Sequence, residues 1–267
     1  MKPVYTLIVL STLALALISC SEDDRDPGKP LRIHPIRMEM EDYHRELMFD
    51  QNDRLAGIKM ISFFRGDEPL ESTINFYYSA GHRIDSSATS DGHLFKYTYE
   101  SGLLTRSDGF INGSLAQYHT FTYDDRKRVI ENISWQHMVE EDGWVPHQKG
   151  TYTYDINDNL VETVLYYYNS GTDQHELLTR FTYSDYDDKQ SADRFFNTTS
   201  FNPTIKFNKN NPGKMVVQNR YGNTTSIEVY SHQYNSSGYP EKRTTTVTIP
   251  YNGQNGSYET NFFYEFR

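Results

Sequence analysis

The chain has 267 residues, of which 15% are aromatic, and its 26 basic and 36 acidic side chains give a net charge of −10. This length allows one large all-β domain or two ordinary domains. The aromatic share argues against intrinsic disorder, which goes with few aromatic residues. The acidic balance argues against a surface that neutralises nucleic-acid phosphates, so we expect no nucleic-acid partner.

The first twenty residues predict export and a lipid anchor. Lys2 precedes an apolar run from Val4 to Ile18, and this run is too short to be preferred as a membrane-spanning helix. The segment that ends in Ser19-Cys20 resembles a bacterial lipobox, in which the cysteine is acylated and becomes the mature N-terminus. We therefore predict a signal peptide over residues 1–19 and lipid attachment at Cys20. The alternative is an ordinary secretory signal followed by an unrelated cysteine.

An acidic and proline-rich stretch follows the cysteine. Residues 21–26 read Ser-Glu-Asp-Asp-Arg-Asp, which is similar to the export signal of surface lipoproteins in Bacteroidota; the alternative is a solvated charged linker. Three prolines and a glycine in residues 26–35 favour an extended spacer. We predict a tether over residues 20–35 and a single domain over 36–267. Because the chain is acidic, we expect acyl chains rather than charge to hold it at the outer membrane.

A block of about 27 residues recurs through the domain. Each copy has two aromatic residues at alternate positions, a polar turn and an aliphatic residue, as in residues 152–160 (Tyr-Thr-Tyr-Asp-Ile-Asn-Asp-Asn-Leu). Aromatic residues at alternate positions share one face of a strand, and Asp, Asn and Gly favour tight turns. Each copy therefore predicts a β-hairpin, and the whole chain about 16–18 strands. The nine aromatic anchors are Phe49, Tyr78, Tyr99, Tyr123, Tyr154, Tyr183, Phe207, Tyr234 and Tyr264.

This pattern, Tyr-x-Tyr-Asp-x-x-(Gly/Asn)-x-Leu, resembles the YD repeat of RHS-type proteins, although other residues often replace the glycine. With the lipobox and the acidic tether, the chain resembles Bacteroidota surface lipoproteins that carry a domain of unknown function described as porin-like. The resemblance implies a long antiparallel meander, curled or closed into a barrel-like sheet, and implies no activity. Charged residues such as Glu131 and Glu162 interrupt the expected strands, so a membrane pore is the less favoured interpretation.

The sequence contains no pattern typical of a catalytic or cofactor site. It lacks a Gly-x-Ser-x-Gly elbow, a phosphate-binding glycine loop and the His-x-x-x-His spacing of a zinc site. Residues 155–159 match only the first half of a calcium loop, so we expect a hairpin turn there. The acidic residues 185–188 are either a weak calcium site or a solvated loop. We expect no catalytic residue, metal or cofactor.

Two tryptophans are the candidate ligand-binding residues. We interpret residues 136–147 as a long connection that carries Trp144, with Trp135 immediately before it. Exposed tryptophans are effective anchors for sugars and proteins, but both indoles could instead pack on the sheet. We favour a non-enzymatic binding or scaffold module for a glycan or a surface protein. The alternative, a hydrolase of polysaccharide or envelope polymer, requires two carboxylates about 5–10 Å apart in a cleft.

Overall fold

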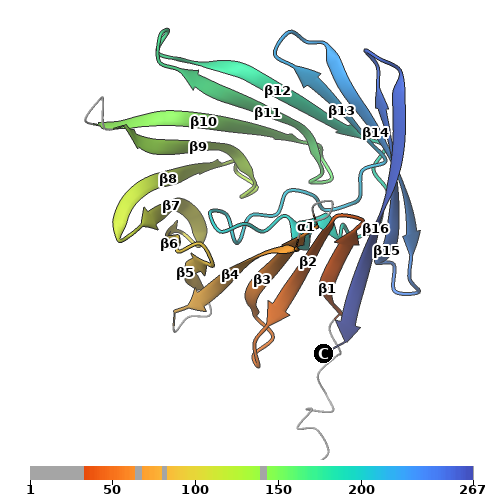
Figure 1. Cartoon of the computed structure of the whole chain (residues 1–267), viewed down its shortest axis with the longest axis horizontal. Helices are drawn as coiled ribbons and strands as arrows, with labels where there is room; N and C mark the ends of the chain where they lie inside the picture. The colour runs from red at the N-terminus through yellow and green to blue at the C-terminus, as the bar shows by residue number, and fades with distance from the viewer. Residues whose placement is uncertain (1–32, 64–67, 80–82, 139–142, 267) are drawn as a thin grey trace, which may run out of the picture. The chain divides into compact units, whose positions relative to one another are not determined.

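The computed structural model describes residues 33–63, 68–79, 83–138 and 143–266, and these form an antiparallel meander that closes into a barrel (Figure 1). Each strand pairs with its neighbours in the chain. The barrel closes because β1 also pairs with β16, which places Met38 opposite Phe262. The predicted all-β meander is therefore confirmed, with sixteen strands. The strands are β1 (Ile33–Met40), β2 (Tyr43–Phe49), β3 (Leu55–Ser62), β4 (Leu70–Tyr78), β5 (Ile84–Thr89), β6 (Leu94–Glu100), β7 (Leu103–Ile111), β8 (Ser114–Tyr123), β9 (Val129–Met138), β10 (Gly143–Tyr154), β11 (Leu160–Asn169), β12 (Gln174–Ser184), β13 (Lys214–Asn219), β14 (Thr224–Tyr234), β15 (Pro240–Ile249) and β16 (Gln254–Phe266).

The first strand begins at Ile33, three residues before the position expected for the start of the domain. Pro35, expected in the tether, is buried within β1, and the pairing with β16 shifts register between Pro35 and Arg37. Proline has no backbone N–H, so a bulge is one of the few places in a strand that accepts it. The predicted signal peptide, Cys20 and the tether up to residue 32 lie outside the described residues.

Four turns of the repeats share one hydrogen-bonding scheme. The Oδ1 atom of Asp155 accepts hydrogen bonds from the backbone N–H groups of Asn157 and Asn159, both at 2.8 Å. Asp50, Asp124 and Asn235 do the same in their own turns. The residue three positions after the aspartate has a positive φ, for example 69° at Asp158. Since only this one residue in each of the four turns is left-handed, the glycine of the pattern is replaceable there at a modest cost.

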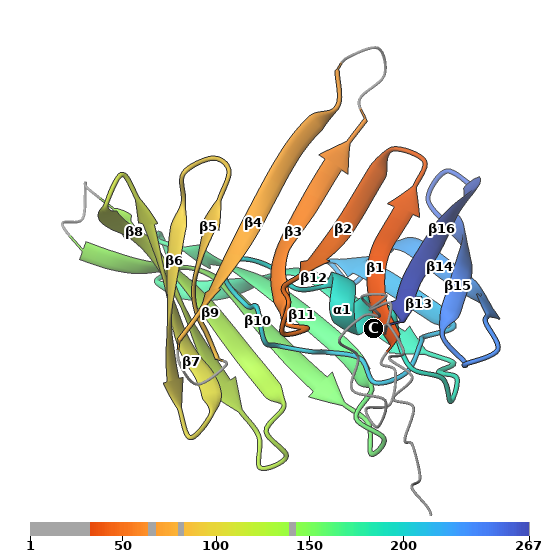
Figure 2. The ribbon, with the colours of Figure 1, turned by 90° about the horizontal axis from the view of Figure 1, so that it is seen from below.

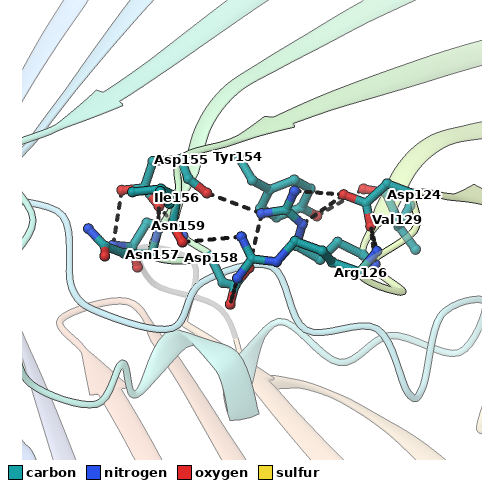
Figure 3. Close-up of polar contacts among 10 residues, drawn as sticks. Asp124, Arg126, Val129, Tyr154, Asp155, Ile156, Asn157, Asp158 and Asn159 are labelled. Carbon is teal, nitrogen blue, oxygen red and sulfur yellow. Dashed lines mark hydrogen bonds and ion pairs between the residues drawn. The ribbon is translucent and has the colours of Figure 1, made fainter.

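In four copies of the repeat, a tyrosine hydroxyl bonds to the strand that precedes its own. The hydroxyl of Tyr154 donates to the carbonyl of Val129 at 2.9 Å, where β9 begins (Figure 3). The tyrosine at the end of three other copies makes the equivalent bond to the first or second residue of the preceding strand. These bonds are Tyr78 to Leu55 (2.9 Å), Tyr123 to Leu104 (2.8 Å) and Tyr264 to Pro240 (2.7 Å). The sequence repeat is therefore also a repeat of tertiary contacts.

Arginines link two adjacent turns at the same end of the barrel. Arg126 Nη2 lies 2.7 Å from Asp158 Oδ2, and Arg128 Nη1 lies 3.0 Å from Asp158 Oδ1 (Figure 3). Arg128 also donates to Asp124 within its own turn, and its guanidinium lies 4.8 Å from the centre of the Tyr154 ring. The turn between β8 and β9 is thus held to the turn between β10 and β11.

The segment between β12 and β13, residues 185–213, lies inside the ring of strands and is called the plug below. It contains the helix α1 (Asp193–Phe196), which both views place among the strands (Figures 1 and 2). Phe196 and Ile205 of the plug are buried in the same core as Leu47 and Ile58. Packing of the plug against the inner face therefore builds part of the core.

The predicted hairpin at Phe207 is wrong, because this residue belongs to the plug. Its ring lies 4.8 Å from that of Tyr152 on the barrel wall. The preceding copy is also altered: the chain leaves the sheet after Ser184, and Tyr186 rather than Tyr183 donates to the carbonyl of Leu160. Burial against the inner wall has overridden the local turn pattern here.

Candidate functional site

Trp135 and Trp144 lie on strands and not on a long connection. Strand β9 continues to Met138 and β10 begins at Gly143, so the interpretation of residues 136–147 as a loop is wrong. The two strands pair to their ends, with Trp144 opposite His137 and Pro146 opposite Trp135. This pairing satisfies the backbone groups that a loop would leave to water. Only residues 139–142 remain between the strands, and they lie outside the described residues.

The two indoles gather with Tyr118 and His137 on the outer face of the sheet, in what we call the outer aromatic cluster. Tyr118 and Trp135 lie on adjacent strands with nearly parallel rings, 5.6 Å between centroids and 11° between planes. The Trp144 ring lies 4.9 Å from Tyr118, and it meets the His137 ring edge to face at 5.4 Å. On β8 the outward-facing Tyr118 lies beside the buried His119, as the alternation of side chains along a strand requires.

A cation borders the outer aromatic cluster. The Arg106 guanidinium lies 3.8 Å from the centre of the Tyr118 ring, and its Nε atom is 2.7 Å from Asp108. The Trp135 Nε1 atom is buried and has no hydrogen-bond partner within the described ranges. Stacked rings beside a cation and an acid provide apolar faces and polar edges together, which is the chemistry that binds sugars or protein side chains.

A second candidate site, the interior cavity, lies between the inner wall and the plug and has a volume of about 370 Å³. Strands β8 to β12 provide one wall, and plug residues between 197 and 208 provide the other. Its deeper lining includes the buried side chains of His119, Ser134 and Thr163, whereas Gln148 and Leu178 are exposed. The cavity therefore has both solvent-exposed and buried polar groups in its lining.

Burial controls ionisation inside the barrel. It lowers the pKa of His119 to about 4, and the imidazole stacks on the Phe201 ring of the plug at 4.5 Å. Burial likewise raises the pKa of Tyr152 to about 12. Both side chains line the interior cavity and are uncharged at neutral pH. None of the residues that line this cavity is an aspartate or a glutamate.

Asp187, one of the acidic residues 185–188 at the start of the plug, has a structural role. Asp187 accepts hydrogen bonds from the backbone N–H of Asn211 at 3.1 Å and from the hydroxyl of Tyr234. These bonds join the two ends of the plug to β14. No group of three or more His, Cys, Asp or Glu residues in the described ranges is arranged to hold a metal ion.

Comparison with known proteins identifies the architecture. No protein-family model matches the sequence, and neither does any curated protein. A porin-like protein from Bacteroides uniformis matches with a TM-score of 0.63 and 13% identity, over 90% of this chain and 99% of that chain. The fold is porin-like. A second porin-like protein, from Bacteroides vulgatus, matches with a TM-score of 0.47 and 12% identity, over 86% of this chain and 98% of its own.

Among the described residues of this porin-like fold, no helix is long and apolar enough to cross a membrane. The sequence had pointed to the two tryptophans, and the structure brings them together with Tyr118 and His137. It had not pointed to the interior cavity. The cavity residues come from five strands and the plug, so neither spacing nor a shared motif connects them in the sequence.

Proposed function

We propose that this chain is a lipid-anchored, surface-exposed protein of the bacterial outer membrane, related to YD-repeat lipoproteins, that binds a glycan without catalysis. The observation that carries the proposal is the outer aromatic cluster, where Tyr118 and Trp135 present parallel rings beside Trp144. Sugar rings have apolar C–H faces that stack on an aromatic face such as that of Trp144, and their hydroxyls meet polar groups such as Asp108 and Arg106 beside the cluster.

The topology supports this proposal because the cluster lies at the end of the barrel opposite to the start of β1. Ile33 begins β1 at the end that carries the turn between β8 and β9. Trp144 is the second residue of β10, whose first residue lies at the other end. A lipid on Cys20 would connect to β1 through thirteen residues, which span at most about 47 Å.

The outer surface favours a water-exposed barrel over a pore. Ion pairs connect neighbouring strands on the outer face, among them Lys149 with Glu131 at 3.1 Å and Lys242 with Glu259 at 2.6 Å. A lipid-facing band would have to bury such charges in hydrocarbon at a high cost. A hydrolase is less well supported, since its two carboxylates are missing from the lining of the interior cavity.

Two experiments test the anchor and the binding surface separately. The variant Cys20→Ala should move the protein from the membrane to the soluble fraction, and its retention in membranes would refute lipid anchoring. For binding, the purified full chain is screened on arrays of bacterial and host glycans. We expect Trp144→Ala to reduce binding at least tenfold, whereas Tyr251→Ala, at an exposed turn, should bind as the wild type does. Equal binding by both variants, or capture of protein partners only, would refute the glycan proposal.

A further inference from the structure

We propose that the interior cavity is a second, independent binding site that takes a neutral polyhydroxylated ligand of about the size of one sugar unit. The cavity volume of about 370 Å³ lies at the lower end of the roughly 300–1,000 Å³ of small-molecule sites. It is bounded by the wall strands and the plug and excludes the outer aromatic cluster. The inference therefore does not depend on the function proposed for that cluster.

Two asparagine amides lining the cavity are arranged as donors. The Oδ1 atom of Asn132 accepts from the Tyr152 hydroxyl at 2.8 Å, and Oδ1 of Asn202 accepts from the backbone N–H of Thr199 at 3.1 Å. Since both oxygens accept hydrogen bonds from the protein, the NH₂ groups are the sides of these amides that face a ligand as donors. Amide donors of this kind favour a ligand with acceptor oxygens.

The remaining polar lining both donates and accepts. Thr163 contributes a hydroxyl near the floor, and Gln148 contributes an amide at the exposed rim. Hydroxyl groups of a sugar also both donate and accept, so they match this mixture. The rings of Phe201 and Phe207 add apolar faces from the plug, and such faces stack on the C–H side of a sugar ring.

The charge of the cavity selects a neutral ligand. Lys149 is the sole charged residue among those that line it, and its ammonium lies 3.1 Å from Glu131 on the outer face. His119 stays uncharged at neutral pH because it is buried. An anionic ligand would find no unpaired cation here, and the chain as a whole carries a charge of −10.

The test measures binding of sugars to the purified full chain by isothermal titration calorimetry. The probes are D-glucose, D-galactose and N-acetyl-D-glucosamine, with D-galacturonate as the charged counterpart of galactose. We expect saturable binding of at least one neutral sugar in the millimolar range, and weaker binding of galacturonate than of galactose. No saturable binding of the neutral sugars at tens of millimolar, or preferred binding of galacturonate, would overturn the proposal.

Two variants locate the binding in the cavity. Thr163→Phe fills the floor and should abolish binding, whereas Gln148→Leu removes one rim amide and should weaken it about tenfold. Gln148 is exposed, so this second variant keeps the test valid if the first one misfolds. The matched control is Gln233→Leu, the same change at an exposed glutamine of β14 outside the cavity, with wild-type affinity expected. Wild-type affinity in Gln148→Leu would overturn the assignment of the site.

Discussion

Removing the Tyr154 hydroxyl tests whether the repeated tyrosine bonds stabilise the barrel. The pairing of β9 with β10 ends where Glu131 lies opposite Thr151, so the Val129 carbonyl lies beyond the last pair. The Tyr154 hydroxyl donates to this carbonyl at 2.9 Å, and Val129 is only 3% exposed. In Tyr154→Phe the carbonyl stays buried without this donor. A buried unsatisfied group costs about 1–3 kcal/mol, which we expect as the loss in the free energy of unfolding.

Urea denaturation of the full chain, followed by circular dichroism, measures this loss. We expect a lower midpoint with an unchanged m-value, because the surface exposed on unfolding is the same. In Tyr154→Leu the Arg128 guanidinium, 4.8 Å from the ring centre, also loses its contact, which adds about 0.5–1 kcal/mol. The control Tyr251→Phe changes a side chain that is 81% exposed, and it should stay within about 0.5 kcal/mol of the wild type. A Tyr154→Phe variant as stable as this control would refute the reasoning.

Three further experiments test the core, the buried histidine and one outer ion pair. Phe196 of the plug is 2% exposed, so Phe196→Ala leaves a cavity and should lower the free energy of unfolding, measured in urea, by about 3–5 kcal/mol. A loss below about 1 kcal/mol would show that the plug is not part of the cooperative core. Burial lowers the pKa of His119 to about 4, below the ordinary 6.5. As the pH falls, the imidazole of the unfolded chain therefore becomes protonated before that of the folded chain. The stability should therefore fall by about 3 kcal/mol as the pH falls from 6.5 to 4, and His119→Gln should remove most of this dependence in urea titrations at each pH. For Glu131 and Lys149, whose side chains are 32% and 28% exposed, a double-mutant cycle should give a coupling below about 1 kcal/mol; a larger value would contradict their description as a solvent-screened pair.

The sequence predicted the parts of the fold that depend on near neighbours in the chain. Aspartates such as Asp155 bond to N–H groups two and four residues later, and the aromatic pairs occupy alternate positions of one strand. Both relations are readable from spacing because they follow from the period of a strand and from the chemistry of a turn. Most of the hairpins were predicted correctly for this reason, Phe207 being the exception, and the all-β class followed from their number.

The site was less predictable, because its residues meet only through strand pairing. Trp135 and Trp144 were chosen as candidates for their residue type, but their contact with Tyr118 requires the register of three strands. The interior cavity gave no signal in the sequence. Asn132 and Asn202 are 70 residues apart and join one lining only because the plug folds back against the wall.

The sequence by itself thus determined the hairpin unit, its repetition and the expectation of export, since each depends on local residue chemistry. Tertiary structure decided that the meander closes through β1 and β16, which no local pattern specifies. It also decided that residues 185–213 leave the sheet, although Phe207 lies within a segment that looks like another repeat. The physical reason is the same in both cases. Pairing the two edge strands and burying Phe196 and Ile205 lower the free energy through contacts between distant segments, and these contacts outweigh the local preference for one more hairpin.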